Sequence, residues 1–293
     1  MRSRDALPPR PTQQLDPLQS PAWLRWTLIT IAVVLMALLV VLPLAMVLGA
    51  AFEKGLGVWF AALIEPDARA ALKLTLLTAA IVIPLNAFFG VLMAWAVTRF
   101  EFPGKRVLLA LIDLPFAVSP VVAGLCLVLL FGSHGWFAAW LAAHDVKILF
   151  ARPAIVLATL FITFPFVVRE LIPLMQQQGA DEELAARSLG AGAWTMFRRV
   201  TLPNIKWGLL YGVLLCSARA MGEFGAVSVV SGHIRGLTNT LPLHIEILYN
   251  EFDSTAAFAA ASLLAGLALV TLVLKFWLEA RHGDALAQSH RRH

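Results

Sequence analysis

The sequence has 293 residues, of which 59% are hydrophobic and only 14% are charged. Soluble domains carry roughly 25% charged residues, so these proportions exclude a soluble globular protein. The net charge is +5, but the basic residues lie between long apolar runs and form no stripe, which argues against nucleic acid as a partner. We therefore expect a protein that lies in a membrane and contacts lipid along most of its length.

Residues 1–22 are rich in proline and arginine and contain no apolar stretch typical of a cleaved signal peptide. This composition predicts a disordered tail over 1–22. A single membrane domain is expected over 23–280, followed by a second tail over 281–293. Cys126 and Cys216 both lie in apolar runs, so we expect neither a disulfide nor a metal site.

Six apolar segments are long enough to cross a bilayer, which needs about 20 residues. The first of them carries no charge over 26 positions. The predicted spans are 27–52, 70–98, 107–131, 154–175, 207–231 and 256–278. The sequence therefore predicts an all-α membrane protein with six transmembrane helices.

Lysine and arginine are distributed unevenly among the segments that connect these spans. Sixteen of the 23 lie in the N-terminal tail, in 99–106, in 169–206 or from Lys275 onward. Because positive charge favours the cytoplasmic side, we expect these segments and both termini in the cytoplasm.

The segment 176–206 is longer than a simple connection between spans, which predicts local structure. Asp181 is expected to cap a short helix with Glu182 and Glu183 in its first turn. Gly190 and Gly192 are expected to end this helix.

A second short helix should lead from there to Pro203, with Trp194 and Phe197 on one side and arginines on the other. Two interpretations of its apolar side remain open. It lies on lipid headgroups, or it packs against another protein.

The spacing within this segment resembles the cytoplasmic signature of ABC-importer permeases, E-A-A-x3-G-x9-I-x-L-P, which docks the membrane subunit onto its ATPase. The matching residues are Ala185, Ala186, Gly190, Val200, Leu202 and Pro203. The signature glutamate is replaced by Leu184, and Glu183 stands one residue earlier, which turns its side chain by about 100° around a helix. The resemblance implies that these six residues, together with Glu183, couple the chain to an ATPase.

Other segments are similar to the sulfate, thiosulfate and molybdate permeases, namely RFEFPGKR at 99–106 and LIDLPFAVSPVVAGL at 111–125. The stretch 218–236 is most similar to the W-type subunit of sulfate/thiosulfate importers. The resemblance implies a type I importer fold in a bacterial inner membrane and transport by alternating access. It also implies three partners, which are a second permease, ATPase subunits and a periplasmic sulfate-binding protein. A molybdate or tungstate permease is the alternative within this class.

The sequence contains no G-x-x-x-x-G-K-[ST] loop, so ATP and Mg²⁺ should bind a partner subunit. We expect no catalytic residue, cofactor or metal in this chain. An ion-coupled secondary transporter is the rival from another class. Such a transporter usually needs several carboxylates within the membrane to couple ion movement. In this sequence, only Asp113 and Glu223 lie well inside the apolar runs. For Asp113 we favour a structural cap or ion pair over contact with substrate.

Arg219 lies near the middle of the fifth predicted span, where a cation is costly. Two interpretations have equal weight. Arg219 neutralises Glu223, four residues later on the same helix, or it attracts an anion that crosses the membrane.

Ser119 and Pro120 interrupt the third span, which suits a gate along the translocation path, although such residues also serve helix packing. On the outer side, His233 and Arg235 precede the amphipathic stretch LPLHIEILYNEF. The resemblance favours a short re-entrant element there that receives the binding protein, and a solvated loop is the alternative.

Overall fold

The computed structural model describes residues 21–291, and every regular element in that range is a helix, which confirms the all-α prediction. The predicted tail lies outside the described residues except for its last two positions, and Ala22 already begins the first helix. The helices are α1 (Ala22–Met36), η1 (Ala37–Val41), α2 (Leu42–Phe52), α3 (Leu56–Ile64), α4 (Pro66–Arg99), α5 (Lys105–Ala117), α6 (Pro120–Phe131), α7 (Ala138–Ala143), α8 (Arg152–Gln178), α9 (Asp181–Ser188), α10 (Ala193–Met196), η2 (Phe197–Thr201), α11 (Leu202–Met221), α12 (Gly225–Ser231), α13 (Leu241–Asn250) and α14 (Ser254–Arg291), where η marks a π-helical segment.

The chain divides after Met46 into two compact units. The first unit contains α1, η1 and the beginning of α2. Together with the rest of α2 these form a continuous apolar stretch, Trp23–Phe52, that is long enough to cross a membrane. Most of its large apolar side chains are exposed, as expected for a helix that contacts lipid.

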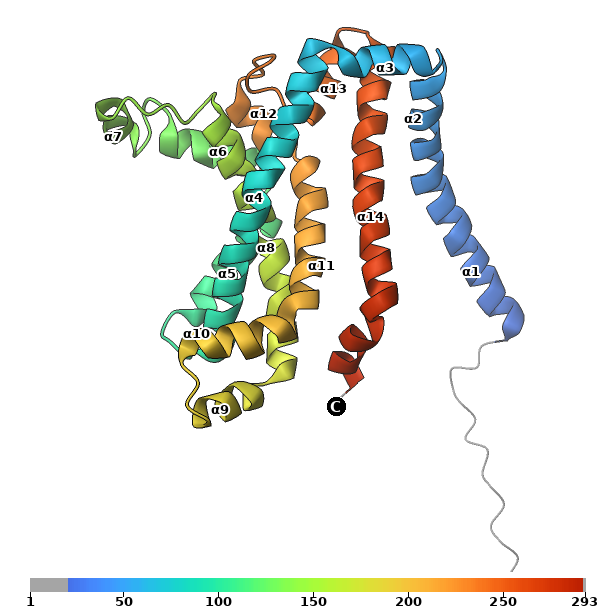
Figure 1. Cartoon of the computed structure of the whole chain (residues 1–293). Helices are drawn as coiled ribbons and strands as arrows, with labels where there is room; N and C mark the ends of the chain where they lie inside the picture. The colour runs from blue at the N-terminus through green and yellow to red at the C-terminus, as the bar shows by residue number, and fades with distance from the viewer. Residues whose placement is uncertain (1–20, 292–293) are drawn as a thin grey trace, which may run out of the picture. The chain divides into compact units, whose positions relative to one another are not determined.

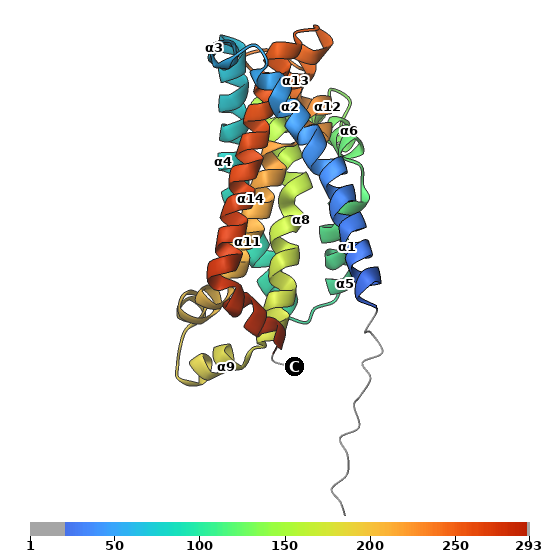
Figure 2. The same cartoon turned by 90° about the vertical axis from the view of Figure 1, so that its right-hand side faces the viewer.

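The second unit is a bundle in which α4, α8, α11 and α14 lie side by side (Figures 1 and 2). Helix α8 packs against both α4 and α11. Glycine permits this close approach on both sides of Val167 in α8. A Cβ on Gly90 of α4 would lie 2.6 Å from Cγ1 of Val167, and a Cβ on Gly212 of α11 would lie 3.1 Å from Cα of Val167. Small residues at helix contacts are typical of membrane bundles.

Two of the predicted spans are bent rather than straight. Helices α5 and α6 meet at 114°, and the segment Ala193–Met221 meets α12 at 51°. The bends lie within the spans predicted over 107–131 and 207–231, and the first of them lies at the interruption expected at Ser119 and Pro120. In the third span the cause is local, because the two residues before Pro120 adopt extended backbone, with ψ of 134° at Val118 and 138° at Ser119. Counting each bent pair as one span gives six, in agreement with the sequence.

The short helices gather at the two ends of the second unit. Helices α9 and α10 lie at one end, which we call the loop end, and α3 and α13 lie at the other, the far end (Figure 1). Helix α13 corresponds to the amphipathic stretch expected to form a separate element. Helix α14 continues to Arg291, so most of the segment predicted as a C-terminal tail, 281–293, is helical.

Candidate coupling loop and translocation path

The segment from Gly179 to Thr201, which we call the coupling loop, contains α9, α10 and η2. Asp181 does not cap α9 as predicted. The N-cap residue is Ala180, no side chain bonds the free amides there, and Asp181 is the first helical residue. The three acidic residues of the first turn instead face the positive end of the helix dipole. Gly190, with φ of 86°, ends the helix, and Gly192 stands as the N-cap of α10.

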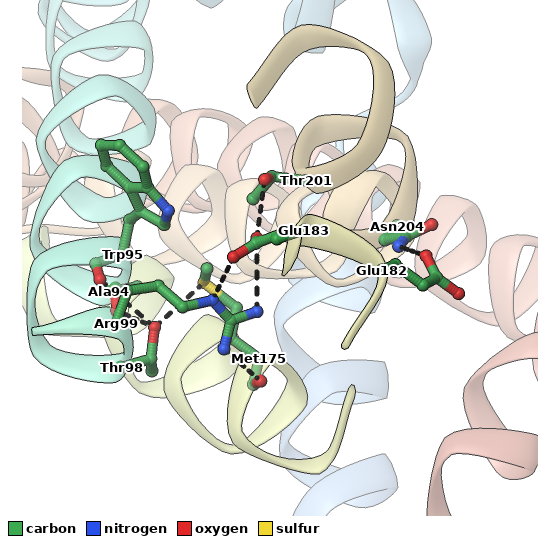
Figure 3. Close-up of polar contacts among 9 residues, drawn as sticks. All are labelled: Ala94, Trp95, Thr98, Arg99, Met175, Glu182, Glu183, Thr201 and Asn204. Carbon is green, nitrogen blue, oxygen red and sulfur yellow. Dashed lines mark hydrogen bonds and ion pairs between the residues drawn. The ribbon is translucent and has the colours of Figure 1, made fainter. Parts of the chain in front are cut away.

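Glu183 is the single buried residue of α9, all of which is described. Its carboxylate faces the end of α4, where Nε of Arg99 lies 2.6 Å from Oε2 and Nη2 donates to Oε1 at 3.3 Å (Figure 3). Oε1 also accepts a hydrogen bond of 2.7 Å from the hydroxyl of Thr201. Nη1 of Arg99 donates to the carbonyl oxygen of Met175 at 3.1 Å. The carboxylate therefore connects α9 with the ends of α4, α8 and η2.

Glu183 was expected among the residues that couple the chain to an ATPase. The structure shows that its carboxylate is engaged inside the chain, and the coupling role stays a prediction. Leu184, at the signature position, points outward and is 60% exposed. Leu189 and Trp194 are 89% and 71% exposed. The exposed surface of the coupling loop therefore carries large apolar side chains among charged ones.

The remaining signature residues divide between the exposed and anchored parts of the loop. Ala185 and Gly190 are exposed and Ala186 is half-buried. Val200 lies in η2, and Leu202 and Pro203 begin α11. Leu202 packs against the apolar core formed by α4, α8 and α11. The second half of the signature thus anchors the loop in the bundle.

Sequence reasoning missed Arg99, Met175 and Thr201. Arg99 was counted only as one of the positive charges beside a span. Two features of the sequence could have pointed to this contact. Arg99 lies at the end of a predicted span, and Glu183 lies two residues before the paired alanines of the signature. Neither feature indicates which residues meet across 84 positions of sequence.

The two breaks in the spans lie against each other, and we call this contact the junction. A Cβ on Gly225 at the start of α12 would lie 2.9 Å from Cβ of Pro120, and one on Gly124 of α6 would lie 2.8 Å from the carbonyl oxygen of Ala226. The structure therefore brings Ser119 and Pro120, predicted along the translocation path, next to the segment that follows Glu223.

Arg219 and Glu223 form the predicted ion pair, with Nη1 of Arg219 2.6 Å from Oε2 of Glu223. This contact is an ion pair without hydrogen-bond geometry, because Oε2 of Glu223 has no hydrogen-bond partner despite the short distance. The other oxygen, Oε1, accepts the amide of Ala226 at 2.9 Å and so caps α12. The Glu223 side chain is 1% exposed and that of Arg219 34%. The pairing is thus confirmed, and attraction of an anion by Arg219 stays a prediction.

Asp113 and Arg169 form a second ion pair between α5 and α8, with Nε of Arg169 2.8 Å from Oδ1 of Asp113. The Arg169 guanidinium also lies 4.8 Å from the ring centre of Phe116. This confirms the structural pairing favoured for Asp113.

His233 and Arg235, the residues predicted to meet a binding protein, lie at the far end and are partly exposed. Arg235 pairs with Glu251, just after α13, and lies 3.9 Å from Asp67 of α4. Nδ1 of His233 lies 4.0 Å from Glu246 of α13. The structure thus brings both residues to one charged surface, and their contact with a partner stays a prediction.

His244 lies beneath this surface on the buried side of α13. Burial lowers the pKa of its imidazole, and the nearby carboxylates of Asp67 and Glu65 act in the opposite direction. On the surface itself, the hydrogen bond to Glu251 raises the pKa of Arg235, which keeps it charged.

Comparison with known proteins now identifies the family. Residues 86–283 match the family described as the binding-protein-dependent transport system inner membrane component. The chain belongs to this family. It is therefore a multi-pass component of an inner membrane and a transport permease rather than an enzyme.

Individual relatives match along nearly the whole chain. The sulfate transport system permease protein CysW of Escherichia coli (strain K12) is 50% identical over 273 residues, covering 92% of this chain and 94% of that protein. The permease protein CysT of the same strain is 39% identical over 246 residues, covering 84% and 89%. A crystal structure of a bacterial ABC transporter that imports alginate matches with a TM-score of 0.72 at 16% identity, covering 92% of this chain and 96% of that one. The predicted permease fold is thus confirmed.

Proposed function

We propose that this chain is the membrane-spanning subunit of an ATP-driven importer of sulfate or thiosulfate. The observation that carries the substrate class is the 50% identity to a sulfate permease over 92% of the chain.

ATP and its Mg²⁺ would bind a separate ATPase subunit that receives the coupling loop. The support is geometric, because the exposed apolar residues Leu184, Leu189 and Trp194 present a face that a partner would shield from water. The same loop is joined to the ends of α4, α8 and α11. Motion of a docked ATPase would therefore reach the membrane-spanning helices, with no need for cofactor or catalysis in this chain.

Two further partners complete the proposed assembly. This chain resembles two different sulfate permeases of one organism, at 50% and 39% identity, which supports pairing with a second, non-identical permease. An alginate transporter of the same fold was solved with a substrate-bound periplasmic protein. By analogy, a sulfate-binding protein would dock at the far end near His233 and Arg235. The loop end and both termini would then face the cytoplasm, in agreement with the distribution of positive charge.

Transport would proceed by alternating access. Closure of the ATPase dimer would displace the coupling loop and the helix ends attached to it, and the junction between α6 and α12 would open toward the far end. Arg219, partly exposed and held by Glu223, would attract the anion without trapping it, because its charge is already largely neutralised.

Uptake of radiolabelled sulfate by proteoliposomes containing the complete transporter tests this proposal. We expect uptake that requires ATP and the loaded binding protein, is competed by thiosulfate, and persists when ionophores collapse ion gradients. A complex with a catalytically inactive ATPase is the control. Uptake that persists with that inactive ATPase and stops with an ionophore would contradict the proposal in favour of an ion-coupled transporter. Competition by molybdate alone would contradict the substrate class.

A further inference from the structure

Helix α9 has almost no apolar attachment to the rest of the bundle. Glu183 is its single buried residue, and Leu184 points away from the protein. Gly179 and Gly190, which flank the helix, have φ of 69° and 86°, and a Cβ on either would meet nothing within 4 Å. Hydrophobic packing therefore does not fix the orientation of α9, and a glycine in the left-handed region stands at each end of the helix, where the backbone can turn.

A polar contact supplies what packing does not. We call the group formed by Arg99, Glu183, Thr201 and the carbonyl of Met175 the latch (Figure 3). The side chains of Arg99 and Glu183 are 13% and 9% exposed, so solvent screens their attraction weakly. Both oxygens of Glu183 are engaged, and the planar guanidinium reaches them through two nitrogens. Such a forked pair resists rotation as well as separation.

The latch and Leu184 lie on different sides of α9, because adjacent residues of a helix are turned by about 100° from each other. Within α9, docking and attachment thus depend on different residues, Leu184 for the first and Glu183 for the second. A change in Glu183 leaves the docking face chemically intact.

From this separation we propose that Arg99 and Glu183 are positioning residues that transmit the motion of the ATPase to the ends of α4 and α8. The inference rests on the proposed function and assigns one step of it. With the latch intact, α9 moves together with these helix ends. Without it, α9 remains docked but swings about Gly179 and Gly190, so that ATP hydrolysis continues while less of each displacement reaches the spans.

The test is the number of sulfate ions taken up per ATP hydrolysed, measured with the complete transporter in proteoliposomes. Glu183→Gln and Arg99→Gln remove one charge of the latch each. Glu182→Gln is the matched control, because Glu182 lies on the same helix but is exposed and contacts only Asn204, at 2.5 Å. We expect the ratio to fall at least about tenfold in the two latch variants, as the loss of a charged hydrogen bond allows, and to stay unchanged in Glu182→Gln.

The amount of ATPase that co-purifies separates transmission from docking. It should be the same in all variants, because Leu184, Leu189 and Trp194 are unaltered. Loss of the ATPase from the Glu183→Gln complex would overturn the proposal, since the latch would then serve docking. An unchanged ratio of sulfate to ATP would also overturn it.

Arg99→Lys decides the matter if the glutamine variants do not assemble. Lysine keeps the charge but cannot reach both carboxylate oxygens and the Met175 carbonyl in one fixed geometry. We expect an intermediate ratio at normal ATPase content, and a wild-type ratio would contradict the proposal. If the wild-type complex transports molybdate rather than sulfate, the proposed substrate fails, but the same ratio measured with molybdate still decides the role of the latch.

Discussion

The coupling loop and the junction each contain a buried arginine–glutamate contact, but the two contacts hold the chain together differently. Arg99 and Glu183 are 84 positions apart and connect separate helices. Arg219 and Glu223 are four positions apart and neutralise each other within one bent span. At the junction, the helices are held instead by close contacts of Gly225 and Gly124 with the facing helix.

An ion pair holds the coupling loop and steric contacts hold the junction, so different substitutions disturb the two regions. A change of one charge at the coupling loop removes the ion pair between α9 and α4 without changing the shape of any packed surface. At the junction, opening requires α6 and α12 to move past each other, because their contact is steric. The loop is therefore suited to transmit force and the junction to respond to it.

The largest effect is expected from Arg219→Met, which leaves the carboxylate of Glu223 buried without a countercharge. Removing one partner of a buried pair costs about 3–5 kcal/mol, so the amount of protein in the membrane should fall sharply. Adding Glu223→Gln should restore it, since the amide oxygen of glutamine can still accept the Ala226 N–H. Immunoblots of membranes measure the effect.

Sulfate uptake by the double variant then tests the second interpretation of Arg219. If this cation attracts the anion, uptake stays low although the protein is present. Wild-type uptake would show that Arg219 serves only to neutralise Glu223.

A smaller effect is expected at the steric contact of the junction. Gly225→Ala places a methyl group 2.9 Å from Cβ of Pro120, which cannot rotate away. Overpacking of this kind costs about 1–3 kcal/mol, so the melting temperature of the purified complex should fall. Gly266→Ala in α14 is the control, because a Cβ there meets nothing within 4 Å. Equal melting temperatures for the two variants would argue against a tight junction.

The smallest change in stability is expected for Gly190→Val, although its effect on transport should be clear. The residue has φ of 86°, where a β-branched side chain is strained by about 1–2 kcal/mol. The strain should turn α9 away from its docked orientation and reduce uptake while the protein remains in the membrane. Gly192→Val, at φ of −68°, should transport normally. Wild-type uptake by Gly190→Val would contradict the coupling role of this turn.

The sequence predicted those features that depend on neighbouring residues or on lipid. Long apolar runs located the six spans, because the bilayer admits few alternatives, and the spacing of Gly190 located the turn after α9. The pairing of Arg219 with Glu223 followed from their separation on one helix.

Features that depend on distant residues were not predictable in the same way. The sequence showed that Glu183 stands one residue before the signature position. The inward orientation of its side chain depends on Arg99, which belongs to another helix. Pro120 marked a break in the third span, but a break in the sequence does not fix the angle of 114° at which α5 and α6 meet. Asp181 had the right chemistry for a cap, but the chain enters the helix at Ala180.

The most direct test of the central claim is the accessibility of Ser119→Cys at the junction, measured from outside with a membrane-impermeant thiol reagent. Cys126 and Cys216 are first replaced by serine and alanine, and the complete transporter is compared with and without a non-hydrolysable ATP analogue and loaded binding protein. We predict that the analogue increases labelling in the wild-type and Glu182→Gln backgrounds but not with Glu183→Gln. An equal increase with Glu183→Gln would contradict transmission through the latch, and no increase in any background would contradict opening at the junction.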